Sequence, residues 1–219
     1  MCFSASSSFT AGVLLSAIGI VSIERAEKKF QIYFACIPLI FAVQQISEGF
    51  LWLALTDSSF AWLRWPSTYF FLFVAQVIWP FWIPFSVLLL EKENNRKKIE
   101  VVLVIIGALI SLYLGFCLLT FPVEANIVGM HISYTQDYPA ELANYGAAFY
   151  SIATIIPPMF SSNKKMWMLG VSVFISYIIS AIFYTAYIVS VWCFFASVIS
   201  AAVFLIILEL KKSIVKQEI

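Results

Sequence analysis

The chain has 219 residues, of which 62% are hydrophobic and 11% are charged, and its formal net charge is +1. A soluble globular chain is roughly 45–50% apolar and about 25% charged, so this composition predicts an integral membrane protein. It excludes a separate water-soluble catalytic domain, nucleic-acid binding, which needs a basic face, and disorder.

Seven apolar runs are each long enough to cross a bilayer, which takes about 20 helical residues. The runs are continuous rather than alternating, which argues against membrane β-strands. We therefore expect an all-α, polytopic membrane protein with a single seven-helix transmembrane domain over residues 1–219. The predicted spans are 8–24, 30–55, 66–90, 99–121, 141–160, 166–187 and 189–209.

The basic residues predict the direction of the chain in the membrane. Of the 13 Lys and Arg residues, only Arg64 falls in a connection on the other side from the rest. Because basic residues are enriched in cytoplasmic loops, the N-terminus is expected outside and the C-terminus in the cytoplasm. The expected location is the cell's inner (cytoplasmic) membrane, with the lipid bilayer as partner.

Glu48 is the ionisable residue deepest in a predicted span. Helical spacing places Gln45, Glu48 and Trp52 on one face, with Gln44 beside them. A carboxylate at this depth is costly unless it is neutralised, paired or placed in a wet cavity. The functional interpretation is a site for a ligand, a cation or a proton. The alternative is a protonated carboxyl group bonded to neighbouring helices.

The third predicted span contains WPFWIP, in which Pro80 and Pro84 each remove a backbone hydrogen bond and favour a kink. Gln76, four residues before Pro80, is placed to bond a freed carbonyl or to reach a cavity. In the fifth span Tyr150 and Thr154 lie one turn apart, which is typical of hydrogen bonds between membrane helices. The one long loop, residues 121–139, mixes apolar and polar residues and is expected to fold back over the outer mouth of the bundle.

Two cysteines, Cys2 and Cys193, are expected at similar depth near the outer side. They are candidates for a disulfide or, with Met130 and His131, for a soft-metal site. The alternative is that both are inert buried thiols. Since His131 is the only histidine, a three-histidine zinc site and a bis-histidine haem are excluded.

The opening MCFSASSSF, the segment QQISEGFLW and the late segment VWCFFAS resemble an uncharacterised family of bacterial seven-helix membrane proteins, defined by a domain of unknown function. The resemblance runs along the whole chain and implies the fold and the membrane location, but no reaction. Gln44 stands where the family pattern has a histidine. The matched positions are Cys2, Phe3, Ser4, Gln45, Glu48, Trp52, Trp192 and Cys193.

These features favour a protein that binds a small ligand, a lipid or a cation in an outward-facing cavity within the bundle. Glu48, Gln45, Gln44, Gln76 and Trp52 are expected to line the cavity. The segment with Cys2 and Ser4, the head of the last span with Trp192 and Cys193, and the loop around His131 are expected to cap it.

Two alternatives stay open. One is a small transporter similar to the SWEET sugar transporters. The other is a membrane enzyme that uses the thiols of Cys2 and Cys193, with Glu48 as acid or base. The sequence indicates neither a cofactor nor an oligomeric state.

Overall fold

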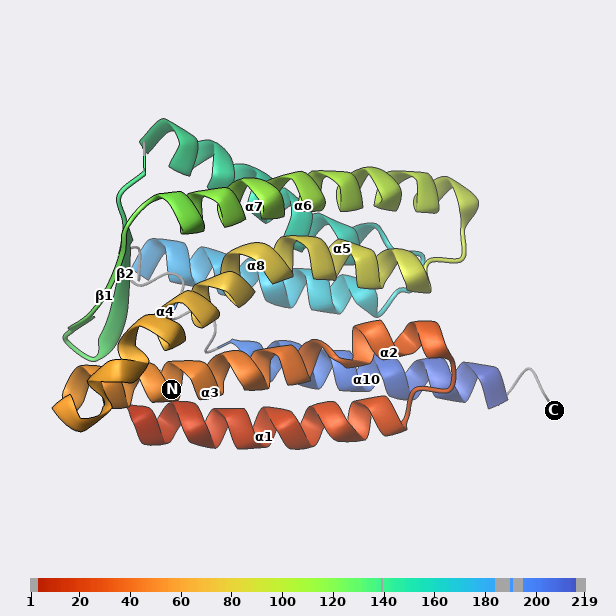
Figure 1. The fold of residues 1–219 in the computed structure, drawn as a ribbon. Helices are drawn as coiled ribbons and strands as arrows, with labels where there is room; N and C mark the ends of the chain where they lie inside the picture. Colours follow the sequence, from red (N-terminus) through yellow and green to blue (C-terminus); the bar gives the residue numbers. More distant parts are fainter. Residues whose placement is uncertain (1–3, 139, 184–189, 191–194, 216–219) are drawn as a thin grey trace.

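The computed structural model describes residues 4–138, 140–183, 190 and 195–215, and for residues 140–145, 196 and 213–215 it describes the backbone alone. Helices dominate the fold (Figure 1). They are α1 (Ala5–Glu24), α2 (Lys29–Ala35), α3 (Ile37–Thr56), the 3-10 helix η1 (Ser58–Leu63), α4 (Arg64–Phe73), the π-helix η2 (Val74–Ile78), α5 (Trp79–Leu90), α6 (Asn94–Thr120), α7 (Ala140–Phe160), α8 (Met166–Phe183) and α10 (Ala196–Val215). Strands β1 (Val123–Val128) and β2 (His131–Gln136) form an antiparallel hairpin.

Within the described part of the chain, five helical segments are long and apolar enough to cross a membrane. They are Ala5–Glu24, Lys29–Thr56, Ser58–Leu90, Asn94–Thr120 and Met166–Phe183. The composition therefore predicted correctly that several apolar helices fit a membrane protein, whereas the number of spans and their direction stay predictions. At the end of the predicted span 189–209, α10 (Ala196–Val215) continues beyond residue 209, and residues 189 and 191–194 lie outside the described part of the chain.

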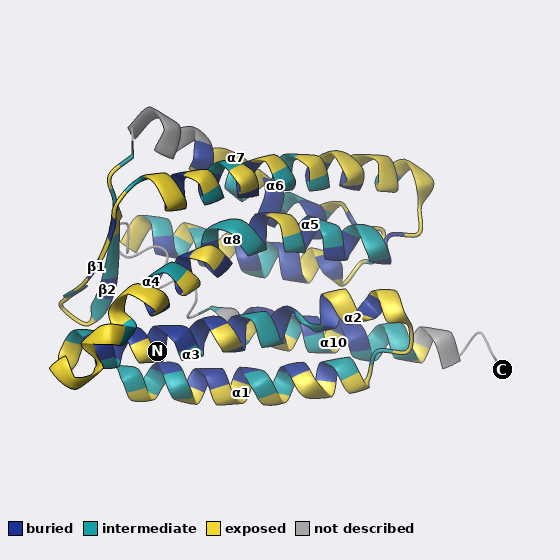
Figure 2. Cartoon of the chain, viewed as in Figure 1, coloured by how far each residue is buried: buried dark blue, intermediate teal, exposed yellow. Residues whose placement is uncertain are grey.

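The long helices pack side by side around a common centre. Helix α1 contacts α3 and α10, α5 contacts α6 and α7, and α8 joins α7 to α10. The hairpin lies across one end of this bundle (Figure 1). Buried positions face the centre and exposed positions face outward (Figure 2). Exposed leucines on α6, such as Leu109, Leu112 and Leu119, are what a helix presents to lipid.

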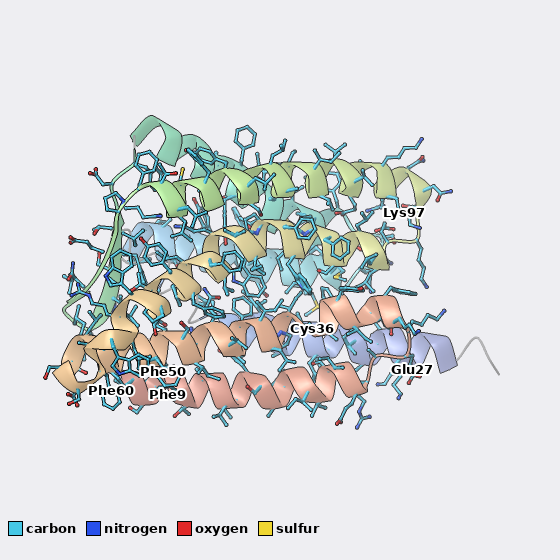
Figure 3. The ribbon with its side chains drawn as sticks, in the orientation of Figure 1. Phe9, Glu27, Cys36, Phe50, Phe60 and Lys97 are labelled. Atoms are coloured by element: carbon cyan, nitrogen blue, oxygen red, sulfur yellow. The ribbon has the colours of Figure 1, made fainter. Side chains whose placement is uncertain are left out.

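The loops that carry most of the basic residues meet at the opposite end of the bundle from the hairpin. Lys211 forms an ion pair with Glu27 there, and the Nζ of Lys165 lies 3.4 Å from the carboxylate of Glu209. Figure 3 labels residues of both ends: Glu27 and Lys97 at the basic end, and Phe9, Phe50 and Phe60 at the hairpin end.

The hairpin is the form taken by the loop expected to fold back over the bundle. Gly129 adopts a positive φ of 64° at its turn, which a residue without a Cβ tolerates. Ala125 and Ile132 pack against Leu51 and Trp52 of α3. The hairpin thus covers the ends of the helices next to it.

Helix α6 approaches α5 so closely that only glycine fits at the contact. A Cβ at Gly107 would lie 2.0 Å from the carbonyl oxygen of Pro80, whereas a Cβ at Gly115 on the same helix would meet only Val77 Cγ2 at 3.4 Å. We expect Gly107→Ala to lower the free energy of unfolding by about 1–3 kcal/mol through overpacking. Gly115→Ala is the matched control and should be neutral or stabilising by up to about 1 kcal/mol. Denaturant unfolding in mild detergent measures both, and equal effects would contradict the close approach.

Candidate functional site

The centre of the bundle is shaped by a π-turn that precedes Pro80. The amide of Trp79 donates to the carbonyl of Val74, five residues back. In that pattern the carbonyl of Ala75 would need the amide of Pro80, which has no hydrogen. The hydroxyl of Tyr150, on α7, donates to this freed carbonyl instead, at 2.8 Å. The sequence of α5 therefore creates a backbone acceptor, and α7 satisfies it.

A cavity of about 260 Å³ lies against this π-turn. Its walls come from α3, η2, α5, α6, α7, α8 and α10 and from the segment after β2. Among the residues that the structure describes, no charged side chain lines it. Lining side chains are mainly apolar or aromatic, with amide and hydroxyl groups between them. The lining residues are Phe41, Gln44, Ala75, Gln76, Trp79, Ile83, Leu114, Tyr138, Gly146, Ala147, Tyr150, Ser151, Thr154, Val173, Tyr177 and Ile199.

Gln44 orders the wall formed by α3 and α5. Its Oε1 accepts a hydrogen bond from the indole Nε1 of Trp79 at 2.9 Å, and its Nε2 lies 3.5 Å from the carbonyl oxygen of Phe71. The ring of Trp79 packs on Phe41 with 4.1 Å between centroids. Because these bonds and contacts fix three large side chains, this wall is preformed.

Gln76 closes the cavity toward the hairpin. Its Nε2 donates to Oε1 of Gln136 at the end of β2, at 2.6 Å. Tyr138, two residues further, also lines the cavity. Burial, with a smaller effect from the Cys117 thiol, raises the pKa of the Tyr138 phenol, so this group stays neutral at physiological pH.

Glu48 lies one helical turn beyond Gln44 but outside the cavity lining. Its side chain is fully buried, and Oε1 accepts a hydrogen bond from the hydroxyl of Ser190 at 2.7 Å. On the same helix the hydroxyl of Ser47 donates to the carbonyl of Ser67 on α4 at 3.1 Å. The cavity thus lies beside Glu48 rather than around it, and the polar face of α3 ties this helix to its neighbours.

The other predicted site residues are spread over the hairpin end. Gln45 is buried on α3, and Trp52 is buried beneath the hairpin. His131 begins β2 next to the turn, and Ser4 caps the N-terminus of α1 by accepting from the amide of Ser7. Cys2, Trp192 and Cys193 lie outside the described residues. Of the ten predicted residues, Gln44 and Gln76 reach the cavity, and a ligand role for any of them stays a prediction.

In the part of the chain that the structure describes, no three His, Cys, Asp or Glu side chains come together, so no metal site is formed there. Cys36 and Cys117 are free thiols. The described lining therefore suits an uncharged organic molecule better than a cation.

Several cavity residues were not predicted from the sequence. Trp79 lies in the WPFWIP motif, from which the sequence predicted a kink at the prolines but no role for the tryptophan. Tyr150 and Thr154 were interpreted as links between helices, and Tyr150 does form such a link while also lining the cavity. Only the three-dimensional packing shows that Tyr138 and Tyr177, from distant segments, face the same space.

Two carboxylates besides Glu48 are buried in the described part of the chain. Glu91 and Glu100, near the basic end, are also buried. Glu100 makes no hydrogen bond to any other residue that the structure describes. Glu100 lies at the edge of the fourth predicted span, 99–121.

Comparison with curated proteins and with solved structures finds no match to the chain. A family model does match, and it is described as a family of unknown function, DUF6629. The match covers residues 1–217, which includes every helix and both strands described above. The chain therefore belongs to the DUF6629 family, which is consistent with the expected membership of an uncharacterised domain family.

Proposed function

We propose that this protein binds a small, uncharged and mainly apolar molecule in the cavity between α3, α5, α6, α7 and α8. The observation that carries the proposal is the lining itself. It combines fixed aromatic walls with a few amide and hydroxyl groups, and no charged side chain is among the lining residues that the structure describes. Ligand sites in proteins have this composition. An apolar cavity of about 150 Å³ already admits benzene, so about 260 Å³ suits a substituted single ring.

The position of the cavity within the bundle supports a binding protein rather than a transporter. Gln76 and Tyr138 place it near the hairpin end. Toward the basic end the bundle is filled by a packed core that includes Phe34, Met166 and Ile206. A transported molecule would need a path through this core, whereas a bound molecule needs only the outer approach.

Filling the cavity tests the proposal. Val173, on α8, is buried in the cavity lining. In Val173→Phe, the phenyl ring should fill part of the cavity. We expect the affinity for acetophenone, a neutral probe with one ring, to fall by about tenfold or more, because interiors have little room to rearrange. Ligand-observed NMR titration in lipid nanodiscs measures this affinity.

The matched control is Val102→Phe, since Val102 is 54% exposed on the outer face of α6. This variant makes the same chemical change away from the cavity and should bind acetophenone like the wild type. The NMR signal of acetophenone binding that remains in Val173→Phe measures partition of the probe into the lipid of the nanodisc. Binding that is equal in all three proteins would sink the proposal.

A further inference from the structure

Gln76 lines the cavity, and its hydrogen-bond partner Gln136 lies at the end of β2, outside the cavity lining. Together the two side chains leave two polar groups unmatched. Nε2 of Gln76 donates to Oε1 of Gln136. The remaining Oε1 of Gln76 and the remaining Nε2 of Gln136 are both buried, and neither bonds to any residue in the described part of the chain. The pair therefore offers one acceptor, on Gln76, and one donor, on Gln136. Exchanging oxygen and nitrogen in both amides leaves the same combination.

Leaving such groups unmatched in a buried place is unfavourable, because each has lost its hydrogen bonds to water. A molecule that supplies both a donor and an acceptor would recover both bonds. A carboxamide or a lactam does this with its adjacent N–H and C=O, and it is uncharged, as the lining requires. An ether, a ketone or an ester brings only acceptors and matches only the amide nitrogen.

We propose that the ligand of the cavity has a carboxamide or lactam group, and that Gln76 and Gln136 recognise this group. This inference rests on the proposed function and specifies its ligand class. The apolar body of the ligand lies between the Trp79 and Tyr177 sides of the cavity, and its amide lies at the hairpin. Because the hairpin supplies Gln136, specificity depends on the segment 123–136 as well as on the helices.

The hairpin does not depend on the glutamine pair for its position. The guanidinium of Arg64 donates to the carbonyl of Ala125 at 2.9 Å, and the ring of Tyr134 stacks on Phe71 with 4.9 Å between centroids. Removing the amide of either glutamine should therefore change recognition without detaching the hairpin. Unfolding temperatures of the variants close to that of the wild type would verify this.

Two probes of nearly equal shape test the inference. Benzamide carries an NH₂ group where acetophenone carries a methyl group, so they differ in the donor alone. We expect the wild type to bind benzamide roughly tenfold more tightly, which is what one or two ordinary hydrogen bonds supply. Gln76→Met should remove this preference, because it should weaken benzamide binding about tenfold more than acetophenone binding. Gln136→Met is the second, independent variant.

The outcomes separate the two proposals. Equal affinities of the wild type for the two probes, or a loss in Gln76→Met that is the same for both, would overturn the amide class while leaving the cavity intact. An ordered water that satisfies the glutamine pair would give this result. If Val173→Phe binds both probes as tightly as the wild type does, the proposed function is overturned, and the inference falls with it.

Discussion

Replacing Glu91 by alanine is expected to lower the free energy of unfolding by about 3 kcal/mol or more, because a buried carboxylate loses three hydrogen bonds to backbone amides. Its Oε1 accepts from the amides of Lys92 and Glu93 at 2.9 Å each, and its Oε2 accepts from the amide of Ser162 at 2.7 Å. The last bond joins the loop after α5 to the loop after α7. Glu91→Gln keeps an acceptor oxygen and should lose about half as much.

The same contacts predict how stability depends on pH. Burial alone would raise the pKa of Glu91, but the hydrogen bonds from Ser162, Glu93 and Lys92 outweigh it and hold the pKa below its ordinary value of 4.5. The folded state therefore binds this proton less tightly than the unfolded state. The stabilisation is fully present above about pH 4.5 and is lost as the pH falls through the folded pKa.

Denaturant unfolding in detergent between pH 7 and pH 3 measures both effects. The gap in stability between the wild type and Glu91→Gln should narrow below pH 4.5. Glu24→Ala, which removes an exposed carboxylate at the same end of the bundle, is the control and should cost less than about 0.5 kcal/mol. A pH-independent gap would show that the charge of Glu91 does not provide the stabilisation.

The second large effect is expected at Glu48. Glu48→Leu should lower the free energy of unfolding by about 3 kcal/mol, because the fully buried hydroxyl of Ser190 loses its acceptor and the leucine brings no polar atom. Glu48→Gln preserves an acceptor oxygen and the volume, so it should cost less than about 1 kcal/mol. Thermal unfolding of the purified variants measures the difference.

A double-mutant cycle with Ser190→Ala isolates the pair. The coupling between Glu48→Leu and Ser190→Ala should exceed that between Glu48→Leu and Ser16→Ala, since the hydroxyl of Ser16 donates to the carbonyl of Gly12 on its own helix. Acetophenone affinity should change by less than about twofold in Glu48→Gln because the carboxyl lies outside the lining. A tenfold loss of acetophenone affinity in Glu48→Gln would instead show that Glu48 contacts the ligand.

The apolar helices could be predicted from the sequence because hydrophobic length alone determines them. The hairpin was not predicted, although its signal was present. Val123, Ala125 and Ile127 alternate with other residues, and Gly129 stands at the turn, as in many hairpins. Six residues per strand are too few for the pattern to stand out in a chain that is apolar almost everywhere.

The candidate site was predicted in part for a similar reason. Gln44 and Gln76 were identified because an amide in an apolar helix is rare and needs a partner. Trp79, Tyr150 and Tyr177 are ordinary residues in such helices, so nothing in their spacing marks a cavity. The distinction between Gln44, inside the lining, and Glu48, outside it, depends on how α3 is rotated against α5, and one sequence does not contain that rotation.

The π-turn at Val74–Ile78 also has an evolutionary consequence. A π-turn holds one more residue than an α-helical turn of the same kind, so η2 is equivalent to a one-residue insertion in an otherwise regular helix. Each residue in a helix advances by about 100°, and an ancestor without the insertion would have presented a different side of α5 to α7. A length difference of one residue in this segment would therefore separate chains that have this cavity wall from chains that do not.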